Sequence, residues 1–417
     1  MPPAVVRVLP EVAALDRPFD YLTGDDDVAV GARVRVPLHG RSVRGWVVAT
    51  PTRAEHPELK PVTKRLGEGP PPTVVELCQW AAWRWAGPWS RLLATASPDR
   101  VVAELPRRPA ATPLPEVHNQ VRVTMGRLVR HGGATLVRVG PCADPLDLVI
   151  GVLHGVEEAG AAGSVVVTTP TIGWAERLAG RLRRRGVAAA GPDRWAEARA
   201  GFPVVVGARA ASLAPVPELA AAIVLDAHDP AYTQTQAPCW NGVALLAERC
   251  RRERAPLVMT SWCADPVVAS LASAHEVTDH EARQWPRLVV ADLRSSDPRE
   301  GLCTAALAAA ARHALAERRD GVAVCVVLQR LGAARLLACK ACGSLVVCEP
   351  HGASLFERDG GLGCARGCAD HPKLCVACGS TALRVVREGI TTLTRRVSAL
   401  LGVDAVEVSA ATAEVPD

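Results

Sequence analysis

The sequence predicts a multidomain α/β protein, and three observations support this prediction. The chain has 417 residues, which at roughly 100 to 200 residues per domain gives two to four domains. From about residue 134, short apolar runs alternate with helical stretches, a pattern typical of a parallel, doubly wound sheet. Seven of the 14 cysteines lie within residues 339–378 in closely spaced pairs, which indicates metal binding rather than a disulfide framework.

The composition is that of a folded chain, with 49% hydrophobic and 22% charged residues. The net charge of +5 is too small to identify a partner. Only four of the 48 basic residues are lysines (Lys60, Lys64, Lys340 and Lys373), so the abundant arginines indicate a composition bias more than nucleic-acid binding. Because no lysine lies between Lys64 and Lys340, chemistry that requires a lysine in this central part is excluded.

The N-terminal part is expected to be a small β-rich domain of residues 1–100. Short β-rich runs at 4–9, 32–36 and 44–48 are separated by Gly, Pro and Asp. Residues 73–96 are expected to be helical, because apolar side chains recur at helical spacing. Prolines are frequent from 98 to 118, and we therefore predict a linker over 101–133.

The central part, residues 134–285, is expected to be the parallel-sheet lobe. Helices are predicted at 173–186 and 241–254. The C-terminal part, residues 286–417, is expected to be the start of a second lobe with a ribbon-like insertion, and it contains an amphipathic helix at 302–319. The predicted strands are 134–139, 164–168, 203–206, 222–225, 256–260, 287–290 and 322–328. No uncharged apolar stretch reaches the roughly 18 residues of a spanning helix, and the N-terminus does not resemble a signal peptide. We therefore expect a cytoplasmic protein that does not bind membranes.

The cysteine-rich insertion, residues 338–380, predicts two structural zinc sites. Its candidate ligands are Cys339, Cys342, Cys348, His351, Cys364, Cys368, Cys375 and Cys378. Eight ligands make two tetrahedral sites, so we expect two Zn²⁺ per chain. The nested order suggests that the outer pairs share one ion and the inner pairs share the other. In the inner site His371 is an alternative to His351, because it stands in CxxH spacing with Cys368. Since protein ligands fill every position, catalytic zinc is not expected.

Two N-terminal motifs stand out, RPFDYL at 17–22 and VPLHGR at 36–41. Together with the helicase-like lobe and the paired zinc insertion, they resemble the PriA family of bacterial replication restart. This resemblance implies that the N-terminal domain is a 3′ DNA-binding domain that holds the terminal nucleotide of a nascent strand. By resemblance, Phe19 stacks on the base, Asp20 accepts the 3′-hydroxyl and Lys60 contacts the terminal nucleotide. The pocket glycine of the family corresponds to Gly40 or to the position of His39.

The resemblance also exposes departures in the helicase motifs. Where the family has a phosphate loop ending in GKT, this chain reads GPCADPLD at 140–147, without the lysine and the hydroxyl residue that hold nucleotide and magnesium. The acidic motif reads DAHD, with Ala227 in place of the glutamate, and TSWCAD at 260–265 also differs. The segment GARAASLAPVPEL at 207–219 keeps the family pattern. We therefore predict a degenerate RecA-like lobe whose fold is retained, and doubt ATP binding.

These observations predict a replication restart protein that binds stalled or branched forks at the 3′ end of the nascent strand and helps to reassemble the primosome, without ATPase or helicase activity. It would be nucleoid-associated, and the resemblance implies primosome and single-strand-binding proteins as partners. The alternative is an active ATP-dependent 3′-to-5′ helicase. A third interpretation is a zinc-ribbon interaction scaffold without preference for DNA ends.

Overall fold

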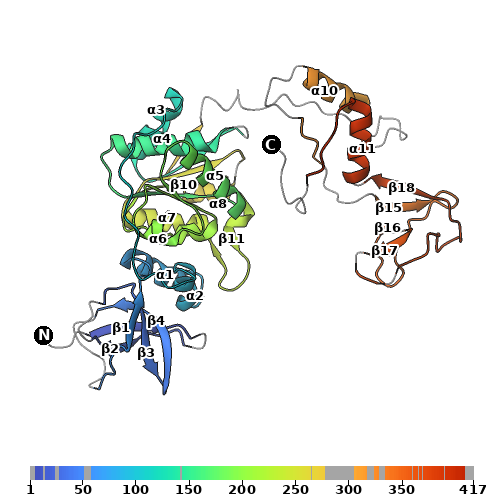
Figure 1. Ribbon diagram of the computed structural model, residues 1–417. Helices are drawn as coiled ribbons and strands as arrows, with labels where there is room; N and C mark the ends of the chain where they lie inside the picture. Colours follow the sequence, from blue (N-terminus) through green and yellow to red (C-terminus); the bar gives the residue numbers. More distant parts are fainter. Residues whose placement is uncertain are drawn as a thin grey trace. The chain divides into compact units, whose positions relative to one another are not determined.

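The computed structural model consists of two compact units, residues 1–286 and 287–417. It describes residues 5–12, 15–23, 28–50, 58–140, 143–263, 265–277, 305–316, 324–327, 334–358, 360–364, 366–368, 370–388 and 390–408. Figure 1 shows the chain with many of the elements used below labelled. Among the described residues, no helix has the length and apolar character that a bilayer crossing requires.

The first unit begins with an antiparallel sheet in the order β2-β1-β4-β3-β5. Its strands are Val5–Pro10 (β1), Phe19–Leu22 (β2), Arg33–Leu38 (β3), Arg41–Ala49 (β4) and Lys64–Gly67 (β5). Alternate residues such as Val34 and Val36 are fully buried, as expected for a strand with one face on a core. The segment before β5 lies beside the edge strand β2. There the Leu22 N–H donates to Lys60 O (3.0 Å), and the Val62 N–H donates to Leu22 O (2.9 Å).

Two helices follow where one was predicted. Pro72–Arg84 (α1) and Trp89–Thr95 (α2) are separated by a short break within the segment expected to be continuous. Ala86 has a φ of 48° and Pro88 is the N-cap of α2, so the chain turns sharply and starts again. A proline disfavours helical backbone at the residue before it, which explains the interruption. The linker predicted at 101–133 is irregular only to residue 118, since Asn119–His131 forms α3.

The lobe is a seven-stranded sheet in the order β14-β6-β13-β10-β7-β9-β8, and its strand pairs are parallel. The strands are Ala134–Arg138 (β6), Ser164–Thr168 (β7), Ala189–Ala190 (β8), Val204–Gly207 (β9), Leu219–Val224 (β10), Leu257–Ser261 (β13) and Ala274–Val277 (β14). The helices are Pro145–Glu158 (α4), Ile172–Arg184 (α5), Trp195–Arg199 (α6), Gly242–Glu253 (α7) and Pro266–Leu271 (α8). Short pieces complete it: Arg209–Leu213 (η1), Pro230–Tyr232 (η2), Thr233–Gln234 (β11) and Trp240–Asn241 (β12).

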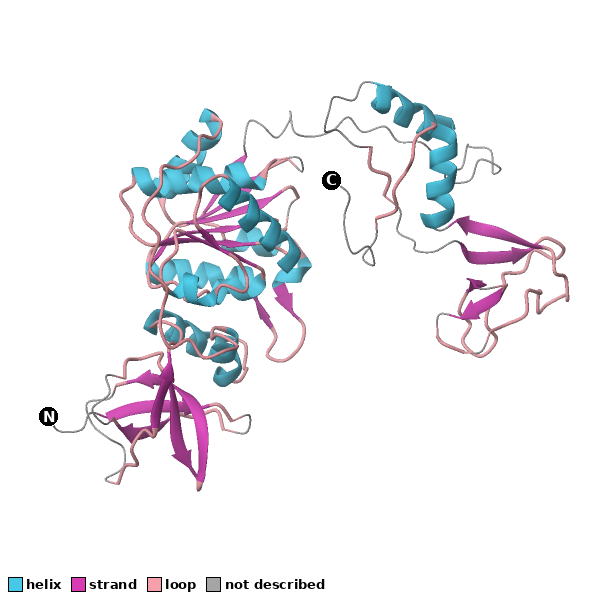
Figure 2. Cartoon of the chain, viewed as in Figure 1, coloured by secondary structure: helices cyan, strands magenta, loops and turns pink. Residues whose placement is uncertain are grey.

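Helices cover both faces of this sheet (Figure 2). One core cluster joins the sheet to α3, α4 and α5, and a second joins it to α6, α7 and α8. Helices α3 and α4 approach closely because Gly126 and Gly155 face each other: a Cβ on Gly155 would lie 2.9 Å from Gly126 Cα. The predicted α/β fold class, with an antiparallel N-terminal domain and a parallel doubly wound lobe, is confirmed.

The second unit contains Ala305–Ala316 (α10) and Ile390–Leu401 (α11), with two antiparallel strand pairs between them in the chain. Ala334–Cys339 (β15) pairs with Leu383–Glu388 (β18), and Leu355–Arg358 (β16) pairs with Gly361–Cys364 (β17). The strand predicted at 287–290 lies outside the described residues. Of the strand predicted at 322–328, the described residues 324–327 form no regular element, so that prediction is wrong over these residues. They lack a described strand partner to complete their backbone hydrogen bonds.

Candidate metal centres and nucleic-acid interface

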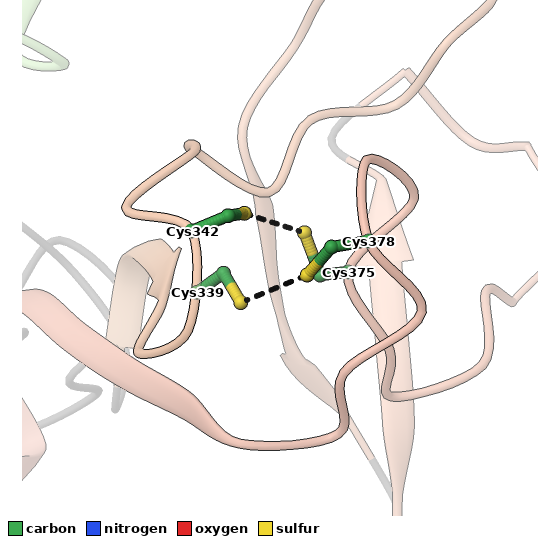
Figure 3. A group of neighbouring side chains, drawn as sticks. All are labelled: Cys339, Cys342, Cys375 and Cys378. Atoms are coloured by element: carbon green, nitrogen blue, oxygen red, sulfur yellow. Dashed lines mark hydrogen bonds between the residues drawn. The ribbon is translucent and has the colours of Figure 1, made fainter.

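The outer cysteine cluster joins two loops that are distant in the chain. Cys339 Sγ lies 3.5 Å from Cys378 Sγ, and Cys342 Sγ lies 3.7 Å from Cys375 Sγ (Figure 3). All four sulfur atoms lie within 4.8 Å of one another. The structure therefore brings together the four residues that the sequence assigns to the outer site.

The inner cluster contains three cysteines and one histidine. His351 Nδ1 lies 3.6 Å from Cys348 Sγ, 3.6 Å from Cys364 Sγ and 3.4 Å from Cys368 Sγ. His371 Nε2 lies 3.7 Å from Cys368 Sγ, but only His351 belongs to the group of four ligand atoms within 4.8 Å. Of the two histidines that the sequence left open, the structure brings His351 into the cluster.

Each of these pairs is shaped by a glycine with a positive φ. Gly343 (φ 78°) and Gly379 (φ 72°) follow the two CxxC pairs, and their N–H groups donate to Cys339 O and Cys375 O. Gly352 (φ 60°) follows His351, and its N–H donates to Cys348 O. In the fourth pair the corresponding glycine is Gly367 (φ 78°), which lies between Cys364 and Cys368. Its N–H donates to Cys364 O, so the CxxxC spacing closes a similar loop.

Both clusters fit a tetrahedral ion with soft ligands. A Zn²⁺ ion with Zn–S distances of about 2.3 Å separates its sulfur ligands by about 3.8 Å, close to the observed spacings. Every cysteine among the described residues is a free thiol. A hydrogen bond from Ser344 lowers the pKa of Cys342 to about 6, and the Arg366 N–H lowers that of Cys364 to about 6. Neighbouring cysteines raise the pKa of Cys368 and of Cys378 to about 12, so each cluster favours one thiolate, the form that binds metal, beside a cysteine that stays protonated without an ion.

In the N-terminal sheet, Phe19 and Tyr21 lie on the same side of β2. Tyr21 is 4% exposed and its hydroxyl donates to Pro37 O (3.2 Å). Phe19 is half-buried against the same core, and the Arg17 guanidinium lies 4.8 Å from its ring centroid. An aromatic ring beside a cation suits a nucleotide, because a base can stack while the cation neutralises a phosphate. Arg17 was not singled out in the sequence, although it opens the RPFDYL motif.

Asp20 lies on the opposite side of β2, directly across from Arg7 on β1. Arg7 Nε donates to Asp20 Oδ1 (2.8 Å) and Arg7 Nη2 to Asp20 Oδ2 (3.4 Å). The Asp20 side chain is only 2% exposed. A 3′-hydroxyl that binds this carboxylate therefore has to share or displace the bonds from Arg7. The sequence did not indicate this partner, since it comes from another strand.

The other two residues of the expected pocket lie in neighbouring backbone segments. Lys60 is exposed, and its carbonyl accepts the Leu22 N–H, which fixes it beside the end of β2. Gly40 (φ 76°) and His39 (φ 47°) form the two-residue turn between β3 and β4. Positive φ at both positions is the geometry of a type I′ hairpin, which explains why glycine follows histidine here.

In the lobe, the N-terminus of α4 carries an ion pair at the position of a phosphate loop. Asp144 caps the helix, accepting the Leu146 N–H at 2.9 Å. Arg181 of α5 binds both carboxylate oxygens, at 2.9 Å and 2.5 Å. Burial by itself would raise the pKa of Asp144, but the bonds from Arg181 and Leu146 hold it below its usual value. The loop residues Pro141 and Cys142 lie outside the described residues.

A second polar group surrounds the altered acidic motif. Ser261 Oγ lies 2.9 Å from His228 Nδ1, and the His228 ring meets Trp262 edge-on with centroids 4.9 Å apart. Asp226 has a φ of 48°, and burial raises its pKa. Ala227 is buried and its N–H donates to Thr260 O (2.8 Å). The position expected to hold a catalytic glutamate therefore carries a packed methyl group.

Comparison with known proteins gives the family context. Residues 7–98 match the PriA 3′ DNA-binding domain. The chain is 28% identical to "Probable replication restart protein PriA" of Mycobacterium leprae over 91% of this chain and 65% of that protein. It is 26% identical to a protein of the same name from Mycobacterium tuberculosis (91% and 64%) and 24% identical to "Replication restart protein PriA" of Synechocystis (58% and 33%).

The chain thus spans between one third and about two thirds of the length of these relatives. Among solved structures, the Pyrococcus furiosus Hef helicase domain matches with 13% identity and a TM-score of 0.29, covering 39% of this chain and 38% of that one. A likeness this weak supports no conclusion about activity. The matched domain and the relatives agree with the resemblance seen in the sequence: residues 7–98 are similar to the PriA 3′ DNA-binding domain, and the chain is similar to PriA replication restart proteins.

Proposed function

We propose that this chain binds stalled or branched replication forks at the 3′ end of the nascent strand and helps to reassemble the primosome without hydrolysing ATP. The match of residues 7–98 to the PriA 3′ DNA-binding domain carries this proposal. The similarity of the chain to PriA replication restart proteins does not depend on this proposal. The proposed location follows from the substrate: a cytoplasmic protein associated with the nucleoid.

The side chains around Phe19 support stacking of a terminal base. Phe19, with Arg17 over its ring, offers a stacking face, and Lys60 stands exposed beside the same strand. Stacking accepts any base, so a terminus can be bound without reading sequence. We propose Asp20, on the other side of β2, as the acceptor for the 3′-hydroxyl, which shares the carboxylate with Arg7, and Gly40 as part of the pocket wall.

The absence of ATP hydrolysis is supported by the chemistry at α4. A nucleotide's phosphates bind free N–H groups at a helix N-terminus. Here the Asp144 carboxylate occupies that end and is held by Arg181, so a phosphate meets negative charge where it needs donors. The central part also lacks any lysine and has Ala227 in place of the acidic residue. Phosphoryl transfer depends almost entirely on such electrostatic stabilisation.

For the second unit we propose one Zn²⁺ in each cluster, in structural sites. The ion would fix the loops around Cys339 and Cys348, and it would supply no chemistry beyond this, because four protein ligands fill each site. The folded insertion would then present a surface to primosome proteins and single-strand-binding protein.

A binding titration tests end recognition. The Kd of the chain is measured for a fork with a free 3′-hydroxyl on the nascent strand and for the same fork with a 3′-phosphate. We expect tighter binding of the free end, and Phe19→Ala to reduce the affinity for it. Equal affinities for the two forks would refute end recognition. DNA-stimulated ATP hydrolysis by the purified chain, abolished by Asp226→Asn, would refute the second half of the proposal.

A further inference from the structure

A large aromatic side chain lies in water on the helix that follows the N-terminal sheet. Trp83, near the end of α1, is 76% exposed. Exposing most of an indole ring leaves a large apolar area in water, whereas tryptophan is usually largely buried. The other side of α1 accounts for the core of this region, with Leu77 and Ala81 fully buried. Trp83 is therefore not needed to complete the core.

Other aromatic and cationic groups lie on the same helix as Trp83 or beside that helix. Trp80 stands one turn earlier on the same helix face and is half-buried. Its ring meets that of Trp85 edge-on, with centroids 5.5 Å apart at 80°. The Arg252 guanidinium, from α7, lies 5.6 Å from the Trp80 centroid, and Arg84 lies 5.8 Å from the Trp85 centroid. These five residues are called the tryptophan–arginine surface below.

The surface rests on a rigid base. Trp80 and Trp85 pack against a buried cluster that contains Leu77 of α1 and Leu245 of α7. Glu248 Oε1 accepts from Arg252 Nε at 2.7 Å, which holds the guanidinium over Trp80. Aromatic rings fixed in this way lose little side-chain entropy when a flat partner stacks on them.

The charge beside the rings is positive. Arg84 lies beside Trp85, and Arg251 and Arg252 both pair with Glu248. Glu76 is exposed one turn before Trp80 on the same helix, so these three cations and two anions leave +1. Glu253, one residue further on, is paired with Arg249. An exposed indole flanked by excess arginine is complementary to unpaired bases linked by phosphates, because the bases stack while the cations meet the backbone.

We propose that the tryptophan–arginine surface binds single-stranded DNA, with a base stacked on Trp83 and the adjacent phosphates facing Arg84 and Arg252. The inference rests on the proposed fork binding and adds a second contact, separate from the Phe19 pocket. Two observations favour DNA over a protein partner. Helix α1 lies inside the segment matched to the 3′ DNA-binding domain, and the surface joins exposed aromatic area with excess positive charge. Duplex DNA is a poor partner, since its base faces are already stacked.

Fluorescence anisotropy titrations of the full chain test this surface. The probes are two forks with the same free 3′-hydroxyl, one with a single-stranded arm of oligo(dT) and one with that arm made duplex. The variants are Trp83→Ala, Trp83→Phe, and Val123→Ala as a control that removes an exposed apolar side chain from α3. We expect Trp83→Ala to weaken binding of the single-stranded arm about tenfold, within the range of base–aromatic stacking. Trp83→Phe should retain most of the affinity.

The duplex-armed fork should bind all variants equally, and Val123→Ala should match the wild type on both forks. Equal affinity of Trp83→Ala and wild type for the single-stranded arm would overturn the inference and leave fork-end recognition intact. The same loss on both forks would also overturn it, because the effect would then not depend on unpaired bases. A wild-type chain that binds neither fork would overturn both proposals.

Discussion

Removing the proposed Zn²⁺ ions is expected to unfold the cysteine-rich insertion while the first unit remains folded. The reason is the small apolar core of this region. Its fully buried aliphatic side chains are Leu337, Val346, Leu355 and Leu362. At about 1.5–3 kcal/mol each, they contribute about 6–12 kcal/mol. A structural zinc contributes about 10–16 kcal/mol, so two ions contribute about 20–32 kcal/mol and outweigh the core.

Hydrogen exchange followed by mass spectrometry measures this directly. The chain is compared before and after a strong chelator, and its metal content is checked by inductively coupled plasma mass spectrometry. We expect amides across residues 334–388 to lose protection, while β6, β10 and β13 in the lobe keep theirs. Metal readdition should restore protection. Unchanged exchange across 334–388 in a chain proven to be metal-free would refute the reasoning, because the small core would then be sufficient.

Single substitutions separate the two sites. Cys339→Ser removes an outer ligand and Cys348→Ser an inner one, and each is expected to lower the zinc content from two ions to one. Cys239→Ser is the matched control, because Cys239 is an exposed free thiol in the first unit. A variant chain that still holds two ions after Cys339→Ser would contradict the assignment of the outer site.

Three further predictions concern the first unit. Burial penalises the ionised form of Asp226 and so raises its pKa. Asp226→Asn should therefore raise the melting temperature at pH 7, and this gain should disappear below about pH 4. Asp144→Ala should cost about 1–2 kcal/mol in urea unfolding at pH 7, from the lost cap and the ion pair with Arg181. Since hydrogen bonds lower the pKa of Asp144, this loss should shrink as acid protonates the carboxyl group. Trp46→Phe, which removes a buried bond to Ser97 (2.7 Å), should cost about 1–3 kcal/mol by the same method.

The sequence predicted best what depends on local spacing. Cysteine pairs at short intervals place two ligands on one loop, so the eight candidate ligands could be identified without a structure. The strand at 164–168 was also predicted with its observed bounds, because its apolar run is short and continuous. The choice between His351 and His371 was different. It depends on the course of the chain between the loops, which spacing alone does not determine.

Contacts between distant segments could not be predicted. Arg7 and Asp20 are opposite each other only because β1 and β2 pair in that register. Arg181 reaches Asp144 from another helix, 37 residues away in the sequence. With 44 of the 48 basic residues being arginines, no pattern distinguishes these two from the others. Their roles follow from tertiary packing, and in each case they change the charge that a ligand would meet.

The predicted domain boundary at residue 100 does not separate two hydrophobic cores. Leu9 and Trp46 of the N-terminal sheet lie in one buried cluster with Leu213 and Leu245 of the lobe. A shared core makes relative motion costly, because any displacement exposes apolar area at about 25 cal/mol per Å². The lobe therefore holds the N-terminal sheet and α1 in fixed positions. On the proposed function, this explains why a lobe without phosphoryl-transfer chemistry keeps its fold: it supports the DNA-binding surfaces, and that task requires packing rather than nucleotide.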